Sequence, residues 1–361
     1  MKTRYGLQGS KPQDIKFFLN IMRLKKQIDR SFLILNKKHL ASLTMRLFLF
    51  ISVLMFSIYF GFGQTVQMEF IPEQITEIPQ SETHALISIF QSTNGQNWKN
   101  NRKWMESNTP SSWFGVSVSQ GHVIELVLIS NHLTGVLPPE ISALTKLEVL
   151  YLFDNSIEGF LPKEIATLQN LKRINLWQNK FSGEIFSEIG EMKNLKELIL
   201  TQNNFTGSIP ESITTLAQLE GLSLAKNNLT GAIPTSFQNL KHLKWLSLSN
   251  NQLSGKIPST LTQMESLQWL SLAENQIEGL IPENIHQLKN LHYLDLSNNR
   301  LTGSIPLNIL KLEKITTLNL SNNKLTGQIP DGLRKMKSIK RLVTSGNLLI
   351  NESIQIQSID P

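Results

Sequence analysis

The sequence of 361 residues contains no cysteine. Disulfide bonds and a thioether-linked lipid anchor are therefore excluded, and the stability of the chain must come from a continuous apolar core. Aromatic residues make up 7% of the chain and charged residues 17%. The apolar run from Leu47 to Phe62 is only sixteen residues long, whereas a membrane-spanning helix needs about 20.

Recognisable catalytic motifs are also lacking. The seven histidines are scattered and form no metal-ligand pattern. No phosphate-binding loop or nucleophile elbow stands out, and Asp295 near Glu274 is the nearest approach to a pair of catalytic acids. A solvated surface accounts better for that pair. The sequence therefore predicts that the protein is not an enzyme and has no cofactor or metal.

Positive charge is concentrated at the N-terminus. The formal net charge is +7, but residues 1–44 hold ten Lys or Arg and two Asp or Glu, which makes +8. The rest of the chain carries −1, and removal of Arg46 with a signal peptide leaves −2. This balance lacks the strongly basic footprint of a nucleic-acid-binding protein, so no nucleic-acid partner is predicted.

Residues 45–63 have the features of a signal peptide. Arg46 precedes the apolar run, and Gly61-Phe62-Gly63 supplies a small-x-small cleavage site. We expect a secreted or cell-surface protein, with residues 64–80 as a linker and a retained signal anchor as the alternative. The basic extension at residues 1–44 indicates either that translation starts at Met45 or that the extension is a cytoplasmic tail on such an anchor.

An asparagine recurs every 24 residues through most of the remaining sequence. A fixed period in this range is typical of a solenoid. A side-chain amide can both donate to and accept from backbone groups, so we expect these asparagines to form a structural ladder between successive turns. The ten positions are Asn131, Asn155, Asn179, Asn203, Asn227, Asn251, Asn275, Asn299, Asn323 and Asn347.

The residues around each asparagine follow the same frame. Leu246 and Leu248 stand two apart, as the inward residues of a short strand do, and stacked repeats place such strands in one parallel sheet. Gly255, four residues after Asn251, suits a tight turn, and Pro258 suits an irregular outer wall. Phe186 replaces the proline in one repeat.

This frame resembles the plant-type subclass of the leucine-rich repeat family, LxxLxLxxNxLxGxIPxxLxxLxx, over residues 123–350. The resemblance implies an α/β-type repeat solenoid. It would be a right-handed superhelix with a concave parallel β-sheet, an irregular or 3-10 convex side, and no chemistry of its own.

The two ends of the repeats are atypical, as terminal repeats are expected to be. Residues 81–122 predict an N-terminal cap, with a helix over 81–92, a strand at 116–118, and Trp98, Trp104 and Trp113 covering the first rung. The stretch from Thr93 to Trp98 resembles the cysteine-free caps of bacterial surface and secreted repeat proteins. The tenth repeat degrades before a tail at residues 351–361, so either the C-terminal cap is minimal or the protein is truncated.

Ligand-binding residues are expected on the exposed side of the strands, where residues 24 apart stack in columns. Two aromatic groups stand out, and exposed aromatic residues in contact usually mark an interaction site. Small residues beside the first group would leave a shallow trough. The candidate residues are Trp245, Trp269 and Tyr293 in the first group, Tyr151, Phe153 and Trp177 in the second, and the charged Arg173 and Asp295 in the same columns.

We therefore predict an exported recognition scaffold that binds a protein or peptide on its concave face. One alternative is a protein that binds a glycan or cell wall, or inhibits a wall-degrading enzyme. Another is a structural surface or adhesion protein in which the aromatic residues only stabilise the sheet. Contact with a membrane is expected only through an uncleaved signal segment.

Overall fold

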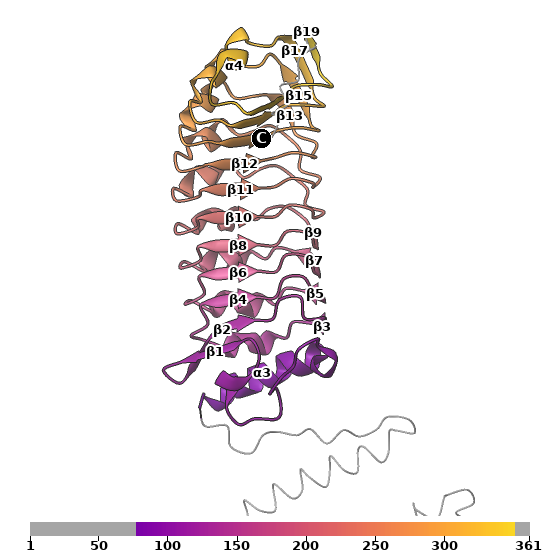
Figure 1. Cartoon of the computed structure of the whole chain (residues 1–361), viewed down its shortest axis with the longest axis vertical. Coiled ribbons are helices and arrows are strands. Elements are labelled where there is room, and N and C mark those ends of the chain that lie inside the picture. Colours follow the sequence, from indigo (N-terminus) through magenta and orange to yellow (C-terminus); the bar gives the residue numbers. More distant parts are fainter. Residues whose placement is uncertain (1–76, 351–361) are drawn as a thin grey trace, which may run out of the picture. The chain divides into compact units, whose positions relative to one another are not determined.

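A computed structural model describes residues 77–350 of the chain. The predicted basic extension, signal peptide and tail lie outside the described residues. Within them, none of the helices has the length and apolar character to cross a membrane. The described residues stack as successive 24-residue turns (Figure 1).

A sheet of eleven strands forms one side of the stack (Figure 1). All neighbours in it are parallel except the first pair, β1 and β2, which are antiparallel. The strands in spatial order are β1 (Val116–Ser119), β2 (His122–Val127), β4 (Val149–Tyr151), β6 (Arg173–Asn175), β8 (Glu197–Ile199), β10 (Gly221–Ser223), β11 (Trp245–Ser247), β12 (Trp269–Ser271), β14 (Tyr293–Asp295), β16 (Thr317–Asn319) and β18 (Arg341–Val343).

The leucine spacing explains both the strand and its register. Leu246 and Leu248 are fully buried, whereas Trp245 and Ser247, which alternate with them, are only partly buried on the opposite face. Trp245 pairs with Trp269, 24 residues later, so each repeat adds one strand at the same position. Each fully buried leucine stabilises the fold by roughly 1.5–3 kcal/mol. The parallel-sheet solenoid predicted from the sequence is confirmed.

The recurring asparagines hydrogen bond to backbone groups of neighbouring turns. Asn227 Oδ1 accepts from the Phe205 backbone N–H at 3.0 Å. Its Nδ2 donates to the carbonyl oxygens of Leu200 and Leu224, both at 3.0 Å, and of Ala225 at 3.2 Å. Asn227 thus ties three backbone segments together through one buried amide.

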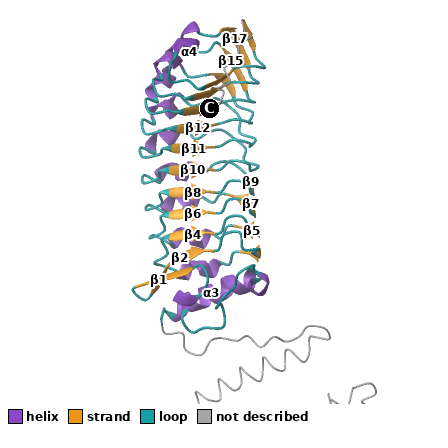
Figure 2. Cartoon of the chain, in the orientation of Figure 1, coloured by secondary structure: helices purple, strands orange, loops and turns teal. Residues whose placement is uncertain are grey.

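Two smaller parallel sheets follow the asparagine turns on another side of the stack (Figure 2). The glycine of the frame has a positive φ, for example +78° at Gly231, a conformation that glycine adopts without steric strain. The first sheet contains β3 (Thr134–Val136), β5 (Ser156–Phe160), β7 (Lys180–Glu184) and β9 (Asn204–Thr206), and the second contains β13 (Glu278–Leu280), β15 (Arg300–Gly303), β17 (Lys324–Gln328) and β19 (Leu348–Ile350).

Short helices form the remaining side (Figure 2). Each follows the proline position of the frame, where φ lies near the value that a proline ring imposes. Phe186 adopts the same conformation, with φ −68° and ψ 151°, so its repeat keeps the shape without proline. The helices are η3 (Pro139–Ala143), η4 (Lys163–Thr167), η5 (Ser187–Glu191), η6 (Glu211–Thr215), η7 (Thr235–Asn239), η8 (Ser259–Gln263), η9 (Glu283–Gln287), η10 (Leu307–Lys311) and the α-helix α4 (Asp331–Lys335).

An aromatic cluster closes the N-terminal end of the core. Helix α3 (Gln80–Ser92) and the short helices η1 (Gly95–Asn97) and η2 (Pro110–Ser112) precede β1. Trp98, Trp104 and Trp113 are buried, as the sequence predicted. Trp104 lies at the centre of the cluster, with its ring centroid 5.0 Å from that of Trp98 and 4.8 Å from that of Trp113.

A buried carboxylate joins this cap to the large sheet. Glu82 in α3 is only 1% exposed, and it accepts from the Val123 backbone N–H at 2.8 Å. Its other oxygen lies 2.6 Å from His122 Nδ1. The first asparagine of the ladder also contacts the cap, since Asn131 Nδ2 donates to the Asn100 carbonyl at 2.9 Å. The cap loop thus takes the place of a preceding repeat.

Candidate functional site

The exposed face of the large sheet carries all eight candidate ligand-binding residues, and the rings of the first group, Trp245, Trp269 and Tyr293, divide into two units. Trp245, Trp269 and Tyr293 occupy equivalent positions on β11, β12 and β14. The sequence predicted that all three would be exposed and adjacent. Trp269 is 45% exposed, whereas Trp245 and Tyr293 are partly buried.

The first unit is Trp245 with Gly221. The indole of Trp245 covers the neighbouring strand at Gly221, where a Cβ atom would lie 1.8 Å from Trp245 Cζ2. The absence of a side chain at Gly221 thus allows the indole to lie over β10. Trp245 is thereby directed away from Trp269, and the expected contact between the two tryptophans is not formed.

The second unit is Trp269 with Tyr293. Their rings are parallel within 3°, with centroids 3.5 Å apart. The Tyr293 hydroxyl donates to Asp295 Oδ2 at 3.1 Å, and the Ser297 hydroxyl donates to Asp295 Oδ1 at 2.6 Å. Burial, together with the neighbouring Asp295 carboxylate, raises the pKa of Tyr293 to about 12. Asp295 therefore holds the tyrosine in place against the tryptophan.

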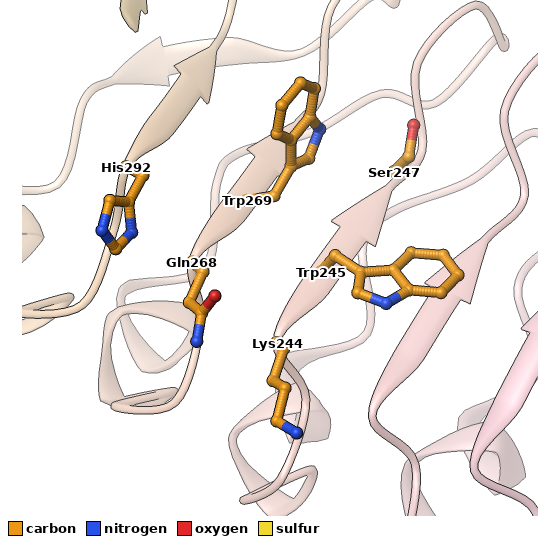
Figure 3. A pocket seen from close by; sticks show the side chains of 6 residues that line it. All are labelled: Lys244, Trp245, Ser247, Gln268, Trp269 and His292. Atoms are coloured by element: carbon orange, nitrogen blue, oxygen red, sulfur yellow. The ribbon is translucent and has the colours of Figure 1, made fainter. Parts of the chain in front are cut away.

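A pocket of about 510 Å³ opens between the two units. Trp245 and Trp269 line it on two neighbouring strands, with Ser247 beside them (Figure 3). Figure 3 also shows its polar side, where Lys244, Gln268 and His292 precede the strands. Lys244 Nζ donates to Glu220 Oε2 at 2.6 Å, so its charge is already partnered. The pocket thus offers apolar ring surface next to groups that can form hydrogen bonds.

The second aromatic group forms a separate patch. Phe153 lies between the other two rings, with its centroid 6.3 Å from that of Tyr151 and 5.9 Å from that of Trp177. Trp177 is 37% exposed. The strand order β6, β8, β10, β11 leaves three strand spacings, or roughly 14 Å, between the rung of Trp177 and that of Trp245. The two patches therefore do not merge.

Charged residues flank the second patch. Arg173 on β6 is exposed and pairs in register with the half-buried Glu197 on β8. Burial raises the pKa of Glu197, and the positive charge of Arg173 partly opposes that rise. Burial also raises the pKa of Tyr151, with Glu197 as a further cause. This region presents a carboxyl group and a guanidinium group beside the aromatic rings.

Glu274 and Asp295, the two acids noted in the sequence, form hydrogen bonds with different partners. Glu274 accepts from Asn250 Nδ2 at 2.6 Å, whereas Asp295 is engaged by Tyr293 and Ser297. Among residues 77–350, no group of three or more His, Cys, Asp or Glu is placed to hold a metal ion.

Four residues of the pocket region were not predicted from the sequence. Gly221 is in the same column as Trp245 and is the smallest residue there, which is the signal that could have revealed it. Lys244, Gln268 and His292 stand one position before the strand column. Their approach to the pocket depends on the turn into the strand, which the period alone does not describe.

A methyl group at Gly221 is expected to reshape the pocket. Gly221→Ala places Cβ where the Trp245 ring now lies, so the indole must rotate away from β10. Because the ring is only partly buried and can move, we expect the free energy of unfolding to fall by only about 1 kcal/mol. A crystal structure of the variant would show the displacement, and an unmoved Trp245 would contradict this account of the site.

Comparison with known families identifies two matching models. The model described as Leucine rich repeat matches residues 193–253 and 255–301. A second, described as Leucine Rich Repeat, matches residues 146–168, 170–192 and 314–336. A comparison with curated proteins finds no match.

Solved plant structures share this architecture. The plant peptide hormone receptor RGFR1 in complex with RGF2 is 35% identical, with a TM-score of 0.59, over 60% of this chain and 35% of the receptor chain. The Arabidopsis receptor kinase HAESA, in complex with the peptide hormone IDA and the co-receptor SERK1, is 32% identical, with a TM-score of 0.53, over 62% of this chain and 41% of the receptor chain. The chain thus spans less than half the length of these receptor chains.

A third solved structure matches over its whole length. This plant ice-binding protein has a TM-score of 0.60 and covers 79% of the present chain. Its sequence identity is 24%, so the likeness concerns the fold alone.

Proposed function

The chain is a leucine-rich repeat protein, and from that premise we propose that it is an exported, non-enzymatic scaffold that binds a protein or peptide. The ligand lies on the exposed face of the large sheet, with an apolar side chain between Trp245 and Trp269. The observation that carries this proposal is the pocket of about 510 Å³ between those two rings. Export rests on the signal-peptide pattern at residues 45–63.

Two further observations support a peptide or protein ligand. The similar receptors RGFR1 and HAESA were solved with the peptide hormones RGF2 and IDA. The aromatic residues also combine apolar ring surface with polar neighbours, which is the composition of energetically dominant residues at protein interfaces. Arg173 and Asp295 extend the surface on either side, Arg173 through contacts with the ligand and Asp295 by holding Tyr293.

Replacing Trp245, Trp269 and Tyr293 together with alanine is expected to weaken ligand binding by roughly thirtyfold or more. The two tryptophan changes remove ring surface from the pocket, and the tyrosine change removes the stacking partner of Trp269. The buried leucines of the same strands stay in place. The measurement uses peptides selected from a phage-displayed library on the full chain. Their affinity for the parent and the variant is then compared by biolayer interferometry.

The matched control removes exposed apolar side chains from a small sheet. Phe160 and Leu280 are 74% and 62% exposed and lie outside the large sheet. Phe160→Ala with Leu280→Ala should change the affinity by less than about twofold. Equal affinity of the triple variant and the parent would remove the three residues from the site, and binding only to a glycan array would overturn the choice of a peptide ligand.

A further inference from the structure

A strip of lysines runs along one border of the large sheet. In each repeat, five residues connect the short helix to the following strand, and we call the last four residues of each connection, taken together, the basic edge. Successive segments are joined by backbone hydrogen bonds, such as those from the Lys196 N–H to Lys172 O and from the Lys244 N–H to Glu220 O, both at 2.8 Å. The basic edge comprises residues 145–148, 169–172, 193–196, 217–220, 241–244, 265–268, 289–292, 313–316 and 337–340.

Charge is segregated onto this strip. The basic edge contains ten lysines and four glutamates, a net charge of +6. The described residues as a whole carry 24 Lys or Arg and 22 Asp or Glu, so the residues outside the edge carry 14 and 18, a net charge of −4. The near-neutral total of the solenoid therefore conceals two regions of opposite sign.

Internal ion pairs cancel only part of the positive charge. Lys172 pairs with Glu148 at 2.6 Å, and Glu220 is shared between Lys244 at 2.6 Å and Lys196 at 3.8 Å. Lys241, Lys289 and Lys337 occupy the same position in alternate repeats and are exposed. These three form no salt bridge within residues 77–350. Their ammonium groups are available to a partner.

The basic edge is continuous with the pocket. Lys244, Gln268 and His292 belong to the edge and also line the pocket, as Figure 3 shows. Lys241 and Lys289 are in the same segments as Lys244 and His292. A ligand with one side chain between the two tryptophans therefore has its neighbouring residues within reach of exposed ammonium groups.

We infer that the pocket and the basic edge form one binding surface for an extended acidic peptide segment, which supplies one aromatic or aliphatic side chain to the pocket and flanking Asp or Glu residues to the edge. This inference rests on the proposed function and specifies its ligand class. Charge complementarity of this kind mainly increases the association rate and selects among partners.

The extent of the positive charge favours a peptide over a nucleic acid. Eight strand spacings place the first and last segments about 38 Å apart, and double-stranded DNA carries roughly 22 phosphate charges over that length. A net charge of +6 neutralises only a minor share of them. Glu125, Glu197 and Asp295 on the adjoining strands would also repel a uniformly anionic strand that crossed the sheet. A peptide with a few carboxylates and one apolar side chain fits both regions.

The test is a selection of peptides from a random phage-displayed 12-residue library on the full chain. We expect the enriched sequences to combine Asp or Glu with a nearby aromatic or aliphatic residue. Replacing Lys241, Lys289 and Lys337 with glutamate brings the edge to a net charge of zero. This variant should bind the enriched peptides roughly tenfold or more weakly, and the loss should shrink as salt is added.

The matched control makes the same charge change on another side of the stack. Lys180, Lys256 and Lys324 are exposed and lie in or beside the small sheets, so their replacement with glutamate alters the net charge equally and leaves the edge at +6. Affinity should then change by less than about twofold.

The inference would be overturned if the enriched peptides showed no excess of Asp or Glu, or if both lysine-to-glutamate variants lost the same affinity for them. Either result would leave the proposed function intact. Stronger binding to single-stranded DNA or to phosphatidylserine vesicles than to the peptides would also overturn it. If the library yields no binding peptide, the inference and the proposed function both fail.

Discussion

Replacement of Trp104 by alanine is expected to lower the free energy of unfolding by roughly 3–5 kcal/mol. Trp104 is 2% exposed and packs against Phe90, Trp98 and Trp113. Its Nε1–H donates to the Phe114 carbonyl at 2.8 Å. Truncation therefore opens a cavity and removes a hydrogen bond at the point where the cap covers the first rung.

Urea denaturation followed by circular dichroism measures this loss. Hydrogen exchange also shows where along the chain stability is lost. Because each repeat contacts mainly its neighbours, unfolding should begin at the end that carries the substitution. Relative to the parent protein, we expect Trp104→Ala to accelerate exchange more in β1, β2 and β4 than in β14 and β16. A uniform change along the solenoid would contradict the proposed role of the cap.

The matched control is the same chemical change at an exposed tryptophan. Trp269 is 45% exposed and makes one ring stack, with Tyr293. A stacked aromatic pair contributes about 0.5–1.5 kcal/mol beyond its buried area, so Trp269→Ala should cost less than half as much as Trp104→Ala. If both substitutions lowered the free energy of unfolding equally, burial of Trp104 in the cap would not be the cause of its effect.

Asn227→Ala is expected to lower the free energy of unfolding by roughly 2–4 kcal/mol. Asn227 Oδ1 is the acceptor for the buried Phe205 N–H, and the substitution leaves that donor unpaired. The three carbonyls that receive Asn227 Nδ2 are affected less, because each has another donor: Leu200 O from Asn203, Leu224 O from Asn251, and Ala225 O from the Gln202 N–H. Most of the cost therefore arises from one orphaned backbone group and the space that the amide filled.

Two further variants test whether the loss of stability comes from the hydrogen bonds of Asn227 rather than from the loss of any asparagine. Asn228 follows Asn227 and is exposed, so Asn228→Ala should cost less than about 0.5 kcal/mol. Asn227→Asp keeps the acceptor for Phe205 but places a carboxylate against three carbonyl oxygens, and it should be more destabilising than Asn227→Ala near neutral pH. Similar stabilities for Asn227→Ala and Asn228→Ala in urea denaturation would contradict the ladder account.

The repeat frame predicted much of the local structure because every turn has the same spacing of buried and turn-forming residues. Leu246 and Leu248 alternate with exposed residues, which predicted the strand, and Gly255 predicted a turn that has a φ of +75°. The helix predicted over residues 81–92 is observed at Gln80–Ser92. These features depend on local spacing and backbone conformation, which a sequence displays directly.

Other features depend on neighbours in adjacent turns. Each residue just before a ladder asparagine from Asn131 to Asn323 also has a positive φ, as Lys226 does with +53°, although side chains of many kinds occupy this position. The nine residues are all polar and three are asparagine, so the sequence carried only a weak signal. The basic edge was similarly hidden, because its lysines are spread over seven of the nine segments and come together only when the turns stack.

By itself, the sequence determined the solenoid, the register of its strands and the face on which a ligand is expected, because a 24-residue period leaves one way to superimpose successive turns. The tertiary structure decided how the side chains on that face are arranged. Trp245 turns toward β10 because Gly221, 24 residues earlier, has no Cβ, and Trp269 instead stacks on Tyr293. A side-chain rotamer responds to whichever atoms the next rung presents, so two tryptophans in one column enclose a pocket rather than form a wall.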